Sequence, residues 1–546
     1  MARLLGTFGF LVVLLRAAIL CLQSFTAGGI VFLLLVARKT ELRREELLRP
    51  AWRMIRTGAL ALALAQLFFV ITNSLVLSYS GDFPLSDVLG ANFVRAGLIA
   101  ILGGLAIMFW PSGMRRSVNA IVLLPAGMML AASVMTSHSA SRLEDRVWLV
   151  AATAVHYLAT ATWIGGLPYL LLAMRRVTDA DAKAQLSRNF SRLAMVSVIF
   201  LFGAGLGMSL AYVGSWDAIY GTSYGVMTAT KVIFFGCLLL LGAANFFIVR
   251  RMAHGNSGEP SSLLRFGEVE IGIGLTVILT AASLTSQPPG VDLTQGRVTL
   301  HEIAARYAPR MPRIASPKLS EISPSTLEMQ KQAEAAGQKL PPAFVPGQGG
   351  TGQQTPGDIA WSEYNHNWAG IIVFLMGILA LLSRSRYFSW AKIWPLMFLG
   401  LAVFLFLRAD PENWPLGPNG FWSSFGEAEV LQHRLAVLLI IVFAIFQWRV
   451  ETNRVQSHAA GLIFPAVCAL GGAVLLTHTH ALSNVKEELL AELSHTPLAI
   501  FAVIAGSSRW LELRLPSQEG ARQYLAWVWP ACFIVIGLIL MDYHEA

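Results

Sequence analysis

The sequence predicts an all-α, polytopic membrane helix bundle with about 14 transmembrane helices in two halves. Of its 546 residues, 55% are hydrophobic and only 13% are charged, about half the charged fraction of a typical soluble protein. Apolar runs of about 18 residues or more, long enough to cross a bilayer as a helix, recur along the chain. Such runs are too long and too continuous for the strands of a membrane barrel.

The first half, residues 1–290, contains eight apolar runs that are separated by polar or basic loops. The predicted spans lie near residues 15–37, 57–78, 92–110, 118–136, 150–174, 193–213, 227–249 and 266–286. The second half, residues 366–546, contains six more. They lie near residues 367–383, 391–408, 430–448, 459–476, 496–511 and 523–541. The first half is therefore expected to be an eight-helix membrane domain, and the second a six-helix membrane domain.

Residues 291–365 separate the two halves and are polar. The run KLPPAFVPGQGGTGQQTPGD, residues 339–358, is rich in Pro, Gly and Gln, a composition typical of a flexible tether. Earlier in the same segment, HEIAARYAPRMP, residues 301–312, favours one short helix. We expect this segment to be an extracytoplasmic linker.

The basic residues indicate how the chain is oriented. Lysine and arginine gather in alternate loops, which marks those loops as cytoplasmic. These loops are 38–56, 111–117, 175–192, 250–265, 384–392, 449–458 and 509–522. Both termini and the linker are then predicted to be periplasmic. The formal net charge of +9 follows from this loop bias, and no nucleic-acid partner is expected.

Seven histidines lie at or just inside the ends of apolar runs, and this topology puts all of them on the same, outer side. Imidazole at the rim of a bilayer is a candidate ligand for a transition metal or for haem iron. We therefore predict that these histidines are metal ligands. They are His138, His156, His366, His433, His478, His480 and His495.

In the first half, His138 ends one span and His156 opens the next. Consecutive helices joined by a short loop are antiparallel neighbours, so the two imidazoles are expected to converge. Met135, about one turn from His138, adds a soft donor of the kind that Cu(I) favours. The pair Gly165–Gly166 predicts a close helix contact, because small residues let helices approach each other.

The motif His156-x6-Trp163-x-Gly-Gly, preceded by Ser-His138-Ser-Ala, resembles the copper resistance D (CopD) family of bacterial inner-membrane proteins. Lys231, Asn245 and the exit segment 284–289 (Leu-Thr-Ser-Gln-Pro-Pro) agree with this resemblance, which covers about residues 10–290. It implies a bacterial inner-membrane protein that handles periplasmic copper. It also implies that His138 and His156 contact copper.

The second half suggests two kinds of site. Copper would take several of its outer histidines, with Glu363 or Glu429 orienting them. A bis-histidine haem b would instead take His366 or His433 opposite His480 or His495. A short similarity links residues 136–156 with 477–495, because both contain a histidine at a helix exit and another at the next entry.

The leading hypothesis is a copper-binding protein that moves copper from the periplasm toward the cytoplasm. We therefore expect a transporter in preference to an enzyme. Its expected partners are membrane lipid, the copper ion, and a periplasmic copper chaperone or other membrane subunits. Two alternatives stay open. One is a haem b-binding electron-transfer or metal-reductase protein, and the other is a non-catalytic accessory subunit of a respiratory complex. The scarcity of Met and Cys along the helices disfavours a simple Cu(I) conduit.

Overall fold

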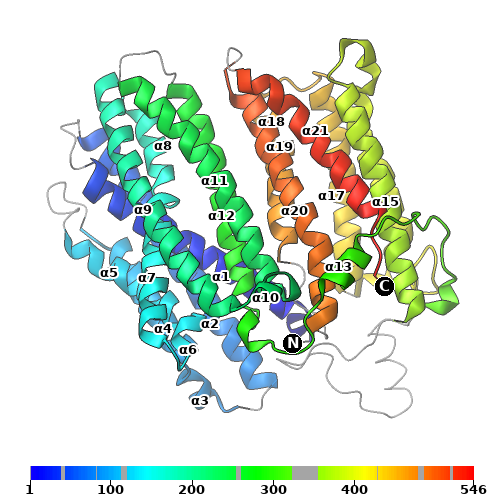
Figure 1. Ribbon diagram of the computed structural model, residues 1–546, viewed down its shortest axis with the longest axis horizontal. Helices are drawn as coiled ribbons and strands as arrows, with labels where there is room; N and C mark the ends of the chain where they lie inside the picture. Colours follow the sequence, from blue (N-terminus) through cyan, green and yellow to red (C-terminus); the bar gives the residue numbers. More distant parts are fainter. Residues whose placement is uncertain are drawn as a thin grey trace. The chain divides into compact units, whose positions relative to one another are not determined.

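The computed structural model confirms the all-α prediction (Figure 1). It describes residues 2–37, 44–80, 83–111, 120–253, 260–322, 355–426, 428–477, 485–516 and 520–545. Within these ranges every regular element is a helix, because long apolar runs in a bilayer must satisfy their backbone hydrogen bonds internally.

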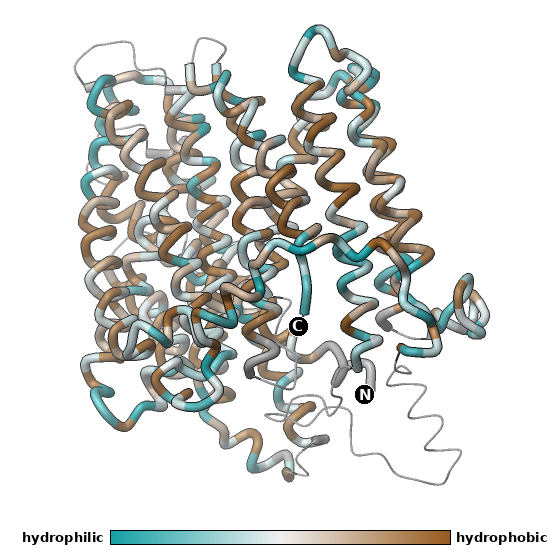
Figure 2. The backbone as a smooth tube through the Cα atoms, turned by 45° about the vertical axis from the view of Figure 1, so that its right-hand side comes forward, coloured by the Kyte–Doolittle hydropathy of each residue, from teal (hydrophilic) through white to brown (hydrophobic). Residues whose placement is uncertain are grey.

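Eleven helices of the described chain are long and apolar enough to cross a membrane. Two shorter apolar helices, at Asn92–Met108 and Ala120–Met135, occupy two further predicted spans. The predicted span 496–511 lies within a helix at Val485–Arg514. Figure 2 shows hydrophobic residues along the shafts of the helices and hydrophilic residues in many of the connections. The polytopic membrane fold is thus confirmed, while the number of fourteen spans stays a prediction.

The chain divides into two compact units, which we name the N-terminal unit (Phe8–Arg297) and the C-terminal unit (Val298–Ala546, with Met1–Thr7). The division falls after residue 297, so residues 291–297 of the predicted linker belong to the N-terminal unit and the rest of the linker belongs to the C-terminal unit. Its short helix is present as α13 (Leu300–Arg306), where Thr299 and Glu302 form a capping box.

The N-terminal unit is a bundle in which α2 contacts α4, α4 contacts α5, α7 contacts α9, and α11 contacts α12. Its elements are α1 (Ala2–Val31), η1 (Phe32–Val36), α2 (Arg44–Ser80), α3 (Leu85–Leu89), α4 (Asn92–Met108), η3 (Ala120–Val122), α5 (Leu123–Met135), α6 (His138–Ser141), α7 (Arg146–Trp163), α8 (Leu167–Arg176), α9 (Ala180–Val213), α10 (Trp216–Gly221), α11 (Ser223–Ala253), α12 (Pro260–Leu284) and η4 (Gly290–Asp292).

The glycines between α7 and α8 lie directly against α1. A Cβ atom on Gly165 would lie 1.9 Å from the carbonyl oxygen of Ser24, and one on Gly28 would lie 2.2 Å from that of Ala161. Any side chain at either position would overlap the facing backbone. The predicted close helix contact at Gly165 is therefore confirmed, and the turn that contains it divides the predicted span 150–174 into two helices.

In the C-terminal unit, α21 packs against both α15 and α20, and α20 packs against α19. Trp394, Phe464 and Trp529 are almost fully buried at its core, with ring centroids 5.1–5.4 Å apart. Besides α13, its elements are η5 (Leu319–Glu321), α15 (Pro356–Leu382), η6 (Arg386–Leu396), α16 (Met397–Arg408), η7 (Ser423–Gly426), α17 (Ala428–Glu451), α18 (His458–Gly461), α19 (Ile463–Leu475), α20 (Val485–Arg514) and α21 (Gly520–Met541).

An ion-pair network ties together one end of the C-terminal unit. Glu512 accepts two hydrogen bonds from Arg384, at 2.7 and 3.1 Å, and one from Arg509 at 2.7 Å. Arg509 also lies 3.5 Å from Glu451. The indole of Trp529 donates to Glu512 at 3.0 Å, and both guanidinium groups lie over its ring. The network joins α17, α20 and α21 to Arg384, which lies two residues beyond the end of α15.

Candidate metal sites

The imidazole of His138 lies at the start of α6, a single helical turn that follows α5. Its ring packs against Tyr212 and Tyr224, with centroid distances of 6.3 and 6.2 Å. Within the described part of the chain, its Nε2 atom is buried and has no hydrogen-bond partner. Buried polar atoms are almost always paired, so this nitrogen calls for a ligand.

Hydroxyl groups hold this turn in place. Thr153 on α7 donates to the hydroxyl of Ser139 at 3.1 Å, and Ser139 lies 2.6 Å from the hydroxyl of Ser137. Ser141 donates to the carbonyl oxygen of His138 at 2.9 Å. The backbone of α6 is thereby fixed against α7, which restricts where the His138 ring can point.

Two methionines contact residues that surround this turn, and neither was singled out in the sequence analysis. Thr153 also contacts the sulfur of Met208 on α9, at 3.3 Å. Met227 on α11 is 1% exposed and belongs to the apolar cluster that contains Tyr212 and Tyr224. On α9, Met208 lies one helical turn before Tyr212. On α11, Met227 lies three residues after Tyr224. Thioether and imidazole are the donors that Cu(I) favours.

Burial is the main cause of a lowered pKa at His138, and nearby Arg16 and Arg142 lower it further, while the Leu284 carbonyl and Asp292 oppose this. The ring therefore stays neutral, and able to bind a metal, below the ordinary histidine pKa of about 6.5. A proton and a metal ion compete for the same lone pair of the imidazole, so a lower pKa at His138 reduces this competition.

We expect copper binding at His138 to persist as the pH falls through about 6.5 and to be lost only at lower pH, because protonation of this ring is displaced downward. Elemental analysis of the copper retained by the purified protein, at pH values from about 7.5 down to about 5, checks this expectation. Loss of half the copper at or above about pH 6.5 would contradict it.

His156 on α7 lies in a different environment. Its Nδ1 atom is also buried without a described hydrogen-bond partner, and its ring lies beside Gly205 of α9. Lys231 of α11 is close enough to act on the ring electrostatically, and a lysine cation disfavours a second cation there. No contact between the rings of His138 and His156 is found among the described residues. Their role as one ligand set stays a prediction.

Met135, the soft donor expected beside His138, packs at the contact between α4 and α5. Its side chain lies against the small apolar cluster of Ala96, Ala100 and Ala132. Its carbonyl oxygen accepts a hydrogen bond from Asn92 at 2.9 Å. Met208, which contacts Thr153 of α7, is a second thioether in this unit.

A buried carboxylate inside a span was also not singled out from the sequence. Glu270 on α12 is 2% exposed and accepts a hydrogen bond from the Asn245 amide of α11 at 2.5 Å. The Trp163 indole is a second partner. Ionisable groups within the bilayer are costly and often functional. Asn245 is one of the residues that carry the family resemblance, and this contact gives it a physical role.

In the C-terminal unit, two of the predicted histidines come together. His366 on α15 and His495 on α20 have ring centroids 6.0 Å apart. Tyr543, just beyond α21, stacks on His366 at 4.0 Å. The Nδ1 atom of His366 lies 2.9 Å from the carbonyl oxygen of Ser362, and a carbonyl only accepts hydrogen bonds. The neutral ring thus keeps the lone pair on Nε2, as metal-binding histidines do.

Glu545 adds a carboxylate beside this pair. Its Oε1 atom accepts hydrogen bonds from the hydroxyl groups of Ser362 at 2.5 Å and Tyr543 at 2.6 Å. Its Oε2 atom is buried and has no described hydrogen-bond partner. Even so, no group of three His, Cys, Asp or Glu side chains in the described ranges is arranged to hold one metal ion. The pair is a candidate site that is not fully assembled.

Among the described residues, His433 and Glu363 have other partners. His433 on α17 faces Asp410, with its Nδ1 atom 2.7 Å from the carboxylate. His478 and His480 lie outside the described residues, so the proposed similarity between residues 136–156 and 477–495 is not tested. Glu363 pairs with Arg313 at 2.9 Å and does not orient a histidine. The side chain of Glu429 is likewise outside the described part.

Comparison with known proteins points to copper. Residues 184–284 match the sequence model of the family described as CopD, copper resistance protein D. The chain is 28% identical over 163 residues to the copper transport protein CutJ of Bacillus subtilis (strain 168), which covers 29% of each chain. It is 26% identical over 185 residues to the copper resistance protein D of Pseudomonas syringae pv. tomato, which covers 32% of this chain and 60% of that protein. No solved structure matches it significantly.

The resemblance to the copper resistance D family is therefore confirmed over residues 184–284, and the long apolar helices are those of a multi-pass membrane protein. Each match covers less than two thirds of the relative. The matched range 184–284 contains Tyr212 and Tyr224, whose rings pack on His138, and it also contains Met208 and Met227. His138 and His156 themselves precede this range.

Proposed function

We propose that this chain, which carries a copper resistance D domain in its N-terminal unit, binds copper and carries it across the bacterial inner membrane toward the cytoplasm. The observation that supports this most directly is the unpartnered Nε2 atom of His138, together with the Met208 sulfur that contacts Thr153 of α7. A soft metal cation would give that nitrogen a partner.

The ligand set that we propose is His138 with Met208, and with Met227 when α11 shifts toward it. Both methionines lie among the neighbours of Tyr212, whose ring packs on His138. One imidazole and one or two thioethers form a Cu(I) site in preference to a Zn(II) site. The aromatic and apolar surroundings exclude water from the site.

The C-terminal unit supports a second, looser site at His366 and His495. Their separation of 6.0 Å between ring centroids is short enough for both rings to reach one ion after a small rotation. We propose that this pair receives copper from the periplasm, from a chaperone or from solution. His433 would act separately with Asp410.

The direction of transport is part of the proposal and depends on topology. Basic loops assign the termini and the histidine-bearing ends of the helices to the periplasm. Ligands at that end suit an importer that collects its cargo outside. The buried Glu270, held by Asn245, offers a protonatable group within the bilayer for coupling this movement to a proton.

The test uses Met208→Leu, because leucine keeps the volume of methionine and removes only the sulfur. We expect the affinity for Cu(I) to fall by about tenfold, the cost of one lost ligand, with the thermal stability retained. Competition with a Cu(I)-specific chelator on the purified chain measures this. Met135→Leu, which removes a methionine that packs at the contact between α4 and α5, is the matched control.

Equal Cu(I) affinity of Met208→Leu and Met135→Leu would remove Met208 from the site. Direction is tested in proteoliposomes that contain a trapped copper indicator, with copper added outside and the orientation of the protein determined by proteolysis. A Soret absorption band together with iron in the purified protein would favour the haem alternative.

A further inference from the structure

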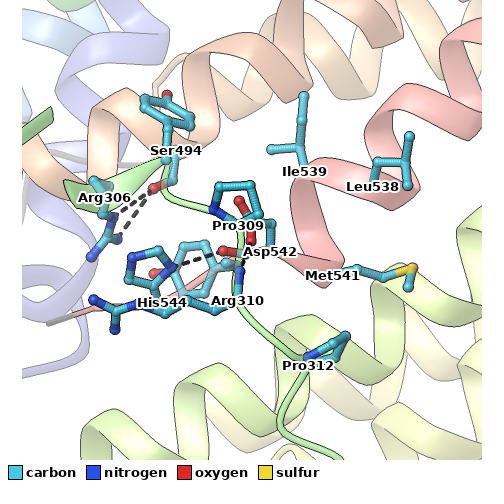
Figure 3. A pocket seen from close by; sticks show the side chains of 12 residues that line it. Arg306, Pro309, Arg310, Pro312, Ser494, Leu538, Ile539, Met541, Asp542 and His544 are labelled. Carbon is cyan, nitrogen blue, oxygen red and sulfur yellow. Dashed lines mark hydrogen bonds between the residues drawn. The ribbon is translucent and has the colours of Figure 1, made fainter. Parts of the chain in front are cut away.

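A cavity of about 410 Å³ lies within the C-terminal unit, between the segment that follows α13 and the last turn of α21 (Figure 3). Arg306 and Arg310 line it from one side, and Leu538, Ile539 and Met541 from another. Met541 is the final residue of a helix long enough to cross the membrane. The cavity thus lies at the end of a span, where hydrocarbon gives way to headgroups and water.

Arg306 is a buried cation without a counter-ion. Its side chain is 5% exposed, and its guanidinium donates to the neutral hydroxyl of Ser494 at 3.1 and 3.3 Å. It also lies over the ring of Tyr543, 5.1 Å from the centroid. No carboxylate in the described ranges forms an ion pair with it. Burying an unpaired charge is costly, so this site calls for an anion.

The other charged groups around the cavity leave an excess of positive charge. Arg310 is exposed, and it forms no ion pair with a described residue. Asp542 also lines the cavity, but its carboxylate accepts the backbone N–H of Arg310 at 2.9 Å. The ring nitrogens of His544 lie 2.9 and 3.0 Å from two carbonyl oxygens, those of Asp542 and Ala305, so this side chain is already paired within the unit.

Another wall of the cavity is apolar. Leu538, which lines it, is 48% exposed and lies within one turn of the end of α21, a helix long enough to cross a membrane. Figure 3 shows Leu538 and Ile539 across the cavity from Arg306. An apolar wall that meets a buried arginine matches a molecule with an anionic head and a hydrocarbon tail.

We propose that this cavity binds a phosphate group, held by Arg306 and Arg310. A planar guanidinium binds two phosphate oxygens at once, which favours phosphate over a monodentate anion. Phosphate has two sources here, the headgroup of an anionic phospholipid and free inorganic phosphate. The apolar wall formed by Leu538 and Ile539 favours the lipid.

The experiment is native mass spectrometry of the purified, delipidated full chain with phosphatidylglycerol, with diacylglycerol, or with inorganic phosphate alone. Arg306→Gln is expected to lower phosphatidylglycerol binding at least about tenfold, the effect of losing a charge-assisted pair. Arg310→Gln, at an exposed position that tolerates substitution, is expected to lower it about threefold. Arg146→Gln, which removes an exposed arginine of the N-terminal unit, is the matched control.

Binding of phosphatidylglycerol that survives in Arg146→Gln and is lost in both cavity variants supports the lipid headgroup. Displacement of the lipid by inorganic phosphate, or binding of inorganic phosphate alone, supports the same site with free phosphate as its ligand. Equal binding of phosphatidylglycerol by the control and by both cavity variants overturns the proposal. Diacylglycerol that binds as tightly as phosphatidylglycerol overturns it too, because the phosphate would then contribute nothing.

Discussion

Replacement of His138 by alanine is expected to remove one equivalent of tightly bound Cu(I) from each chain. The Nε2 atom of this ring is buried and has no hydrogen-bond partner among the described residues, so its loss would leave the proposed site with thioether sulfur alone, which holds Cu(I) weakly. We expect the affinity at this site to fall by at least about tenfold, since changes even to groups behind the ligands cost that much. Elemental analysis and chelator competition on protein purified without a histidine tag measure the change.

His301→Ala is the control for this experiment, because His301 is an exposed histidine on α13. Its loss should leave the copper content unchanged. The histidines of the C-terminal unit stay intact in both variants, so copper that they hold appears equally in both measurements. The same copper content in His138→Ala and His301→Ala would exclude His138 from the site.

Glu512→Ala is expected to destabilise the C-terminal unit by about 3–5 kcal/mol, the cost of removing one partner from a buried ion pair. Glu512 accepts hydrogen bonds from Arg384, Arg509 and the Trp529 indole. Without it, the two guanidinium groups lie close together with only Glu451 to balance them. Thermal unfolding of the purified protein in detergent measures the loss as a lowered midpoint.

The matched control is Glu321→Ala, which removes a carboxylate from an exposed pair with Lys318. The two charged groups are 3.9 Å apart, and their side chains are 82% and 54% exposed. Solvent screens such a pair, so its loss should leave the midpoint almost unchanged. An equal effect of the two substitutions would show that burial does not strengthen the Glu512 network.

The fold was predictable because membrane insertion imposes a simple length rule on apolar segments. The short helix α13 was also foreseen, within residues 301–312, and Gly165 was foreseen as a contact because of its small size. The division of the span 150–174 into two helices was not foreseen, because a glycine at position 165 does not by itself predict a turn. The turn depends on how closely α1 approaches this position.

The candidate sites were predictable in part. A histidine at the end of an apolar run can be recognised from the sequence alone. The predicted topology put His366 and His495 on the same side of the membrane, as one of several possible pairs, and the structure brings their rings together. The contribution of Met208 was invisible, because it is one of several methionines in apolar helices and becomes special only when α9 packs against α7. Glu270 was visible as a charge in a span, but its partner Asn245 is on another helix.

The two ends of the C-terminal unit are fastened differently. At one end, Arg384, Arg509 and Glu512 clamp the helices with multiple charged hydrogen bonds. At the other, His366 and His495 meet through ring contacts beside a cavity. If helices of this unit separate during an exchange of cargo, we expect them to rotate about the ion-paired end as a hinge. The unit would then open to an ion at its histidine end while the ion-paired end stays closed, so no continuous path for protons would form across it.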